Sequence, residues 1–192
     1  MDRGTRTFWL VIALLLGASC FFGVRAESVR RSVQRASAEV QNGDLLTSST
    51  IQDGDTVLLA NAAGDTVTVR VIGIKAFDAT AAHDPTTPHA KEAVASLERA
   101  LAGKPVRVML GTPPRDRHGR TLATLFVDDV DVGLELVRAG RVLVYTPFPF
   151  PMMGEYLRAQ AEAEAARRGL WADAVVAERA RALIAQWKRG AP

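Results

Sequence analysis

The sequence predicts an α+β fold in which a five-stranded Greek-key β-barrel packs against about three helices. Three observations lead to this prediction. Short segments that alternate or run apolar recur between residues 45 and 145, with turn residues between them. One helical segment is inserted after the third strand, and alanine-rich helical segments follow the last. Short strands with an inserted helix are typical of a barrel of the OB-fold type.

Turn signals bound the expected strands. The first two, residues 45–51 and 56–60, flank Asp53-Gly54, which is a strong hairpin signal. A turn at residues 61–65 leads into a third strand over residues 66–74. The later strand segments are expected over residues 106–110, 122–127 and 141–145.

Helices are predicted where apolar residues recur at helical spacing. Residues 90–101 place Ala93, Val94, Leu97 and Leu101 on one face. Two further helices are expected over residues 134–139 and 156–168, because Gly140 and Gly169 follow them as helix-ending residues. A last amphipathic helix is expected over residues 175–188.

The N-terminus differs from the rest of the chain. Phe8 to Val24 contains no charged residue and would span roughly 26 Å as a helix. That length is short for a membrane span and long for the apolar part of a signal peptide. We therefore expect residues 1–26 to be a signal peptide or a hydrophobic transmembrane anchor helix. A polar linker (27–44), the barrel domain (45–171) and the C-terminal amphipathic helix (172–192) complete the predicted order.

The charge of the chain limits the classes of function. The formal net charge is +3, and three arginines against one aspartate in residues 1–26 account for +2 of it. The remainder argues against strong non-specific binding to duplex nucleic acid, which depends on many phosphate contacts. A small local basic site is still compatible with this count. Cys20 is the only cysteine, so no intramolecular disulfide can form.

Three motifs carry the chemistry of phosphodiester cleavage. Asp53-Gly54-Asp55-Thr56 places two acids on a tight turn, Arg70 lies in a strand among apolar neighbours, and Arg120 ends the turn Asp-Arg-His-Gly-Arg. Carboxylates can hold a metal ion, and guanidinium groups can neutralise charge on phosphorus. Each motif also has a plainer interpretation, as a hairpin with solvated acids or as a surface arginine in a weak ion pair.

In order and spacing, these motifs resemble those of the thermonuclease (staphylococcal nuclease-like) family, and the resemblance covers Leu45 to Trp171. It implies an OB-fold barrel packed with helices and a nuclease activity. By the same resemblance, Asp55 is a Ca²⁺ ligand with Asp53 beside it. Arg70 grips the scissile phosphate, and Arg120 stabilises the transition state.

One block departs from the family pattern. Lys75-Ala76-Phe77-Asp78 stands where the family carries Asp-Thr/Ala-Pro-Glu. Lys75 thus replaces an acidic calcium ligand, and Asp78 replaces the glutamate that the family uses as general base. An ammonium group can supply part of the charge of a cation, but it cannot acidify a bound water as a metal does. We expect a degenerate calcium site and a compromised base.

Further residues are candidates for contact with a nucleotide. By the resemblance, Tyr145 falls in a loop that lies near the bound nucleotide, and His118 takes a position that is aromatic in the family. The aromatic and methionine side chains of residues 148–153 could stack on bases, cap the core, touch a membrane or pack onto the final helix. His83, Asp84 and His89 could form a different metal site with Asp78, although their spacing matches no known ligand pattern.

Two functions follow from these residues. The first is hydrolysis of nucleic acid, DNA or RNA, by a nuclease-like domain that is weak or independent of metal. The second is a non-catalytic OB-fold module that binds single-stranded nucleic acid or a protein partner. In either case we expect a monomeric domain. It would be exported to the periplasm or the exterior, or anchored in a membrane through residues 8–24 if they are not cleaved.

Overall fold

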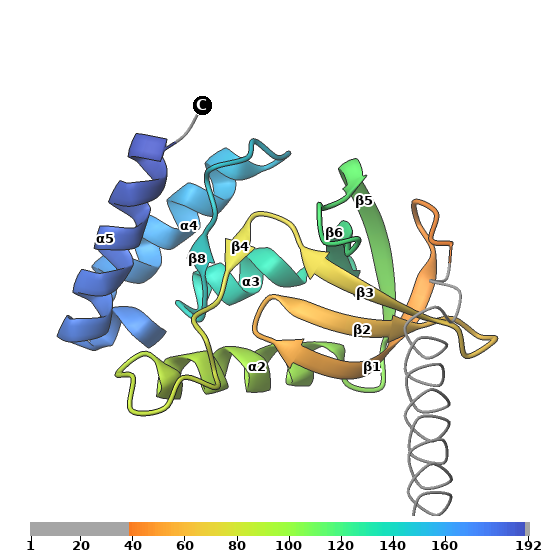
Figure 1. Ribbon diagram of the computed structural model, residues 1–192, viewed down its shortest axis with the longest axis horizontal. Helices are drawn as coiled ribbons and strands as arrows, with labels where there is room; N and C mark the ends of the chain where they lie inside the picture. Colours follow the sequence, from red (N-terminus) through yellow and green to blue (C-terminus); the bar gives the residue numbers. More distant parts are fainter. Residues whose placement is uncertain (1–38, 191–192) are drawn as a thin grey trace, which may run out of the picture. The chain divides into compact units, whose positions relative to one another are not determined.

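Five strands close into a barrel in the computed structural model, which describes residues 39–190 (Figure 1). The strands are β1 (Leu45–Asp53), β2 (Thr56–Ala60), β3 (Thr66–Val71), β5 (Pro105–Arg115) and β6 (Thr121–Val127). Their order is β3-β2-β1-β5-β6, and a parallel pairing of β3 with β6 closes the ring. A short strand, β7 (Val130–Asp131), pairs antiparallel with the end of β6. The predicted five-stranded barrel is confirmed.

The third strand is shorter than the sequence predicted. Gly73 has a φ of +77° and breaks the expected strand over residues 66–74. The chain then forms β4 (Ile74–Lys75), which leaves the barrel and pairs with β8 (Leu143–Val144). A glycine allows this bend because residues with a Cβ atom rarely adopt positive φ. A Cβ atom at this position would also meet the ring of Phe150 at 2.4 Å.

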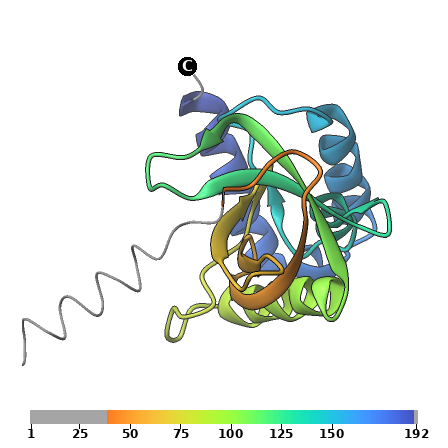
Figure 2. The same ribbon diagram turned by 90° about the vertical axis from the view of Figure 1, so that its right-hand side faces the viewer.

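Four α-helices pack on the barrel in the described part of the chain, one along β1 and the others on the side of β4 and β8, as Figures 1 and 2 show. They are α2 (Thr87–Leu101), α3 (Val132–Arg138), α4 (Met153–Ala165) and α5 (Ala174–Gly190), with a 3₁₀ helix, η1 (Gly169–Ala172), before the last. Helix α2 begins earlier than predicted because Pro88 suits the first helical turn. Asp131 caps α3 by accepting a hydrogen bond from the Leu134 amide.

Two apolar clusters hold these elements together. The larger fills the barrel and its contacts with α2, α3 and α4, and includes the fully buried Val57, Val69, Leu97 and Leu125. The smaller joins β8, α4, η1 and α5 around Leu143. Together the clusters fix β4, which lies between the barrel and the helical side and carries Lys75.

Predictions for the N-terminus concern residues outside those described. The predicted signal or anchor in residues 1–26 and most of the linker lie outside the residues that the structure describes. Within residues 39–190, no helix has both the length and the apolar character needed to cross a membrane. The predicted domain boundaries and the localisation therefore stay predictions.

Candidate functional site

The β1–β2 hairpin brings the first acidic motif against β3 and β4. Thr56 of β2 lies opposite Arg70 of β3 in the antiparallel register. Gly54 at the turn packs so closely that a Cβ atom there would lie 2.7 Å from Ala93 of α2 and 2.8 Å from Ala76. Only glycine allows this approach, which seats the hairpin on α2 and turns Asp55 inward.

Asp55 is the centre of the site and is almost fully buried, with 1% of its surface exposed. Its Oδ1 pairs with Nη1 of Arg70 and accepts a hydrogen bond of 3.1 Å from the Thr56 hydroxyl. Its Oδ2 accepts the Ala76 amide at 2.8 Å and lies 3.5 Å from Nζ of Lys75. Both carboxylate oxygens are therefore engaged by protein donors, as a buried charge requires.

Asp53 supports this arrangement from the hairpin turn. Its Oδ1 accepts the amide of Asp55 at 2.8 Å. Its negative charge also acts to raise the pKa of both Arg70 and Lys75. Asp53 is half-buried, so it contributes charge to the site while part of its side chain contacts solvent.

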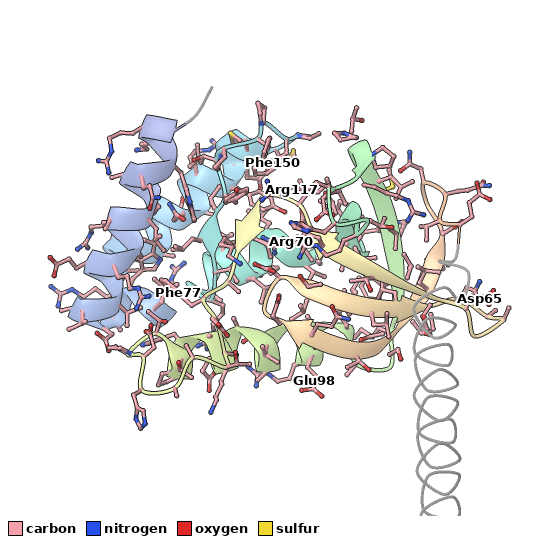
Figure 3. All side chains as sticks on the ribbon, viewed as in Figure 1. Asp65, Arg70, Phe77, Glu98, Arg117 and Phe150 are labelled. Carbon is pink, nitrogen blue, oxygen red and sulfur yellow. The ribbon has the colours of Figure 1, made fainter. Side chains whose placement is uncertain are left out.

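Arg70 is held inside the protein, where the sequence predicted a side chain directed into a groove. Its side chain is 11% exposed. Besides the ion pair with Asp55, Nη1 donates to the Asp55 carbonyl at 3.1 Å and Nη2 donates to the Ile74 carbonyl at 2.8 Å. Burial lowers its pKa to about 10, so the group stays charged at neutral pH. Figure 3 shows Arg70 where β3 leads into β4.

Lys75 is the exposed cation of the site. Its side chain is 48% exposed, and its ammonium group faces Oδ2 of Asp55. Burial of its stem and then the charge of Arg70 lower its pKa. Lys75 thus lies beside Asp55, the residue that the family resemblance makes a calcium ligand. The exposed side of the Lys75 ammonium group is open to an anion from solvent.

Arg120 reaches the same neighbourhood from the loop between β5 and β6. Thr121 of β6 lies opposite Val69 of β3, so Arg120 precedes the strand that pairs beside Arg70. After burial, the charge of Arg120 also contributes to the lowered pKa of both Arg70 and Lys75. The Nε and Nη2 atoms of Arg120 both lie 2.8 Å from Oδ2 of Asp116, and its side chain is 34% exposed. We call Arg70, Lys75 and Arg120 the cation cluster.

Asp78, the predicted base, is exposed and turned toward its own loop. Its Oδ1 accepts hydrogen bonds of 2.7 Å from both the amide and the hydroxyl of Thr80. These bonds lower the pKa of Asp78. A carboxylate with a lowered pKa is a weaker proton acceptor, so this environment opposes the role of general base.

Calcium, the cofactor implied by the resemblance, does not fit these residues. Ca²⁺ takes six to eight oxygen ligands, mostly carboxylates and carbonyls. Here both oxygens of Asp55 are already engaged, and the Lys75 ammonium lies 3.5 Å from one of them. Across residues 39–190, no group of three His, Cys, Asp or Glu side chains could hold a metal ion. The alternative site at residues 83–89 does not assemble either, because Asp84 is paired with Arg179.

The predicted nucleotide contacts, Tyr145 and His118, differ in their surroundings. The amide of Tyr145 donates to the Gly73 carbonyl at 2.8 Å, beside the bend that follows Arg70. His118 is exposed at the tip of the β5–β6 loop, where its ring accepts a hydrogen bond from Arg117.

The loop of residues 148–153 divides between core and surface. Phe150 packs on Gly73 and on Tyr156, whose ring centroid lies 5.1 Å away, and thus contacts the barrel core and not the final helix. Phe148 and Met152 are exposed, at 69% and 56%. Two surface depressions, of about 240 and 460 Å³, both border Arg138 and Glu155 and are not lined by the cation cluster. A groove lined by the cation cluster therefore stays a prediction.

Two contacts were missed by the sequence reasoning. Thr80 holds Asp78, and the Asp-x-Thr spacing is a local turn signal that could have indicated it. Trp187 of α5 meets Tyr145 edge-on at 5.1 Å, which anchors the final helix beside the site. No signal in the sequence pairs these two residues, which are far apart in the chain.

Comparison with known proteins gives the family. Residues 68–173 match the model described as "Staphylococcal nuclease homologue". The chain is 28% identical over 141 residues to a thermonuclease of Staphylococcus intermedius, covering 72% of this chain and 82% of that protein. It is 30% identical to an uncharacterised endonuclease of Haemophilus influenzae (64% of each chain) and to an uncharacterised protein of Bacillus anthracis (63% of this chain, 58% of that protein). The matched residues cover more than half of the chain, which therefore belongs to the staphylococcal nuclease homologue family.

Proposed function

We propose that the protein hydrolyses phosphodiester bonds of DNA or RNA slowly and without calcium. The observation that carries this proposal is the ammonium group of Lys75, 3.5 Å from Oδ2 of the buried Asp55. A fixed positive charge there takes over part of the electrostatic role of a metal ion. Membership of a nuclease family supports the reaction type, since named relatives include a thermonuclease and an endonuclease.

The exposed cations act on the phosphate. Lys75 and Arg120 are 48% and 34% exposed, so both can meet the non-bridging oxygens of a phosphodiester. Arg120 would exchange its bonds to Asp116 for bonds to the substrate. These contacts strengthen as charge grows on the oxygens in the transition state, which is where such donors accelerate a reaction. Arg70 pairs with the buried Asp55 and so fixes the carboxylate that faces Lys75.

Proton transfer is the weak step of this mechanism. Water must lose a proton as its oxygen attacks phosphorus, and the leaving oxygen must gain one. Asp78 is the acid that the family resemblance assigns to the first transfer, but its bonds to Thr80 lower its pKa. A base held this way gives only part of the usual 10²–10⁴-fold contribution of general base catalysis. Slow turnover is the expected consequence.

The hydrogen bonds from Thr80 to Asp78 favour a second candidate function. If Thr80 keeps Asp78 away from the attacking water, the domain would bind nucleic acid through the cation cluster without cleaving it. The barrel and the cluster would be unchanged in that case. The two candidates differ in one measurable outcome, which is turnover of a labelled strand.

A nuclease assay with and without chelator tests the proposal. Labelled single-stranded and duplex DNA and RNA are incubated with the purified protein in calcium, in magnesium and in excess EDTA. Hydrolysis that persists in EDTA supports the proposal, and hydrolysis that needs calcium contradicts it. Binding without any cleavage would establish the second candidate.

Matched variants tie the activity to the cluster. Arg120→Met should lower the rate by about 10²-fold or more. Arg107→Met is its control, because Arg107 is 36% exposed and also pairs with one aspartate. Lys75→Met has an equally close control in Lys104→Met, since Lys104 is 49% exposed and pairs with Asp128. Equal effects of site and control variants would remove the cluster from the mechanism.

We further propose that the domain is monomeric and is exported or attached to a membrane. The support for export or membrane attachment is the charge-free stretch from Phe8 to Val24, which lies outside the described residues. Cell fractionation followed by N-terminal sequencing separates the possibilities. A mature chain that begins near residue 27 indicates a signal peptide, and an intact chain in the membrane fraction indicates an anchor. An intact chain in the cytosol would contradict both.

A further inference from the structure

Helix α5 contacts the loop that carries Asp78. This loop, residues 76–86, joins β4 to α2 and passes beside α5 in Figure 1. Phe77, the neighbour of Asp78 in the chain, is half-buried and packs against the smaller apolar cluster. Figure 3 shows Phe77 on the side of the loop that faces α5. Three side chains of α5 pack against the same cluster, those of Leu183, Ile184 and Trp187.

A charged contact from α5 holds the far end of the same loop. Nη1 of Arg179 donates to Oδ1 and Oδ2 of Asp84, at 2.8 and 2.6 Å. Oδ1 of Asp84 also accepts hydrogen bonds of 2.8 Å from the amide and the hydroxyl of Thr86. Thr86 is 2% exposed and directly precedes α2. Arg179 therefore joins α5 to the point where the loop enters α2.

Other hydrogen bonds fix the loop between these two contacts. At its start, the Ala76 amide donates to Oδ2 of Asp55 at 2.8 Å. In its middle, the Ala81 carbonyl accepts the hydroxyl of Thr87 at 2.6 Å, which holds the loop on the first turn of α2. Asp78 lies between Ala76 and Ala81 in the chain. Its position thus depends on contacts of the loop with α2 and α5 as well as with the site.

Two features of these contacts are particular to this chain. Helix α5 begins at Ala174, just beyond the residues 68–173 that match the family model. Phe77 stands where the family pattern of this block has proline, whose ring would fix the φ angle. Without that ring, the order of the turn depends on side-chain contacts, and α5 supplies two of them through Phe77 and Arg179.

We propose that α5 positions the loop of Asp78 for the reaction, through Phe77 and Arg179. Both are positioning residues, because their side chains act on the loop and not on the phosphate. A loop held at both ends keeps the Asp78 carboxylate at one place relative to Lys75, which precedes it in β4, and so raises the fraction of bound substrate that meets it. This inference rests on the proposed function, since that function makes Asp78 the base.

A matched pair of α5 variants tests the contact with the loop. Arg179→Gln removes the charge that holds Asp84. Arg181→Gln is its control, because Arg181 also lies in α5, is 58% exposed against 52% for Arg179, and pairs with one carboxylate, that of Glu164. An exposed ion pair of this kind changes a local equilibrium by about 1.4- to 5-fold. Hydrogen exchange in residues 78–86 should speed up by that factor in Arg179→Gln and stay unchanged in Arg181→Gln.

Kinetics of the same full-length variants tests the role in the reaction. In excess EDTA, kcat of Arg179→Gln for a labelled strand should fall by a similar factor, and Arg179→Lys should restore it. KM should stay unchanged, because phosphate binds at the cation cluster and slow turnover makes KM a measure of binding. Phe77→Ser should lower kcat further, since Phe77 adjoins Asp78. If Phe77→Ser does not fold, the two surface variants of α5 decide the question.

The outcomes separate this inference from the proposed function. If the parent protein cleaves the strand but loop exchange is the same in Arg179→Gln, the inference alone is overturned. Faster exchange with unchanged kcat overturns it as well, because the tether would then not serve the reaction. So do equal effects of Arg179→Gln and Arg181→Gln. A parent protein that binds the strand and cleaves nothing overturns the proposed function and the inference with it.

Discussion

Two cations contact Asp55, and the structure predicts that they serve different purposes. Arg70 is enclosed with the carboxylate, whereas nearly half of the Lys75 side chain is exposed. Replacing each with methionine keeps most of the apolar stem of the side chain and removes its charge. We expect Arg70→Met to destabilise the fold and Lys75→Met to weaken phosphate binding with little effect on stability.

Burial sets the size of each effect. Removing one partner from a buried ion pair costs about 3–5 kcal/mol, because the other charge stays buried without compensation. Asp55 is 1% exposed and Arg70 is 11% exposed, so this range applies to Arg70→Met. An exposed pair contributes about 0.2–1 kcal/mol, and this range applies to Lys75→Met. The first loss is a large part of the roughly 5–15 kcal/mol that stabilises a typical domain.

Urea unfolding at neutral pH measures both losses. The free energy of unfolding should fall by several kcal/mol for Arg70→Met, and by no more for Lys75→Met than for the control Lys104→Met. Lys75→Met should still reduce binding of an oligonucleotide, while Lys104→Met should not. Equal destabilisation by the two site variants would refute the reasoning, since Lys75 would then be a structural partner of Asp55.

Three further outcomes are expected. Hydrogen bonds from Thr86 and Arg179 lower the pKa of Asp84 to about 2, below an ordinary value of about 3.9. Its charge thus stabilises the fold above pH about 4 and is lost as the pH falls toward 2, so Asp84→Asn should flatten the acid decline of the urea midpoint. Gly73→Ala should cost at least about 1–2 kcal/mol in thermal unfolding, because φ is +77° and Phe150 lies in the way; an unchanged Tm would contradict this. The triple variant Lys75→Asp, Phe77→Pro, Asp78→Glu should bind calcium by calorimetry and cleave in a calcium-dependent way. A folded triple variant that binds calcium but cleaves nothing would indicate a barrel adapted to binding.

Local signals predicted the barrel well. Asp53-Gly54 marked the β1–β2 hairpin, and the apolar spacing in residues 90–101 marked α2, because turns and helix faces depend on nearby residues. The break at Gly73 was missed, although a glycine within an apolar strand is a signal for a bend. The pairing of β4 with β8 joins segments about 70 residues apart, and strand spacing alone does not determine such a pairing.

The site was harder to predict than the fold, since its chemistry depends on where side chains point. Through the resemblance, the sequence predicted that Asp55, Arg70 and Lys75 lie close together, and in the structure Asp55 pairs with both cations. It did not indicate that the Arg70 guanidinium would donate its hydrogen bonds to buried carbonyls, or that Thr80 would hydrogen-bond to Asp78. The contacts of Arg70 form only when the β3–β4 bend has its final shape, whereas the bond from Thr80 to Asp78 spans two residues and follows a local turn signal.

Position 75 decides which ion this site can hold. An acid there would add one negative charge next to Asp53 and Asp55, whereas Lys75 adds one positive charge, so the two alternatives differ by two charge units. The ammonium lies 3.5 Å from Asp55, the distance of a direct ion pair, and it leaves its other side to solvent. A calcium ion would have to enter against this charge and displace it, but a phosphate oxygen is attracted by it. Under the proposed function, one residue changes the site from one that binds a metal ion and then phosphate to one that binds phosphate directly, while Arg70 pairs with the buried carboxylate.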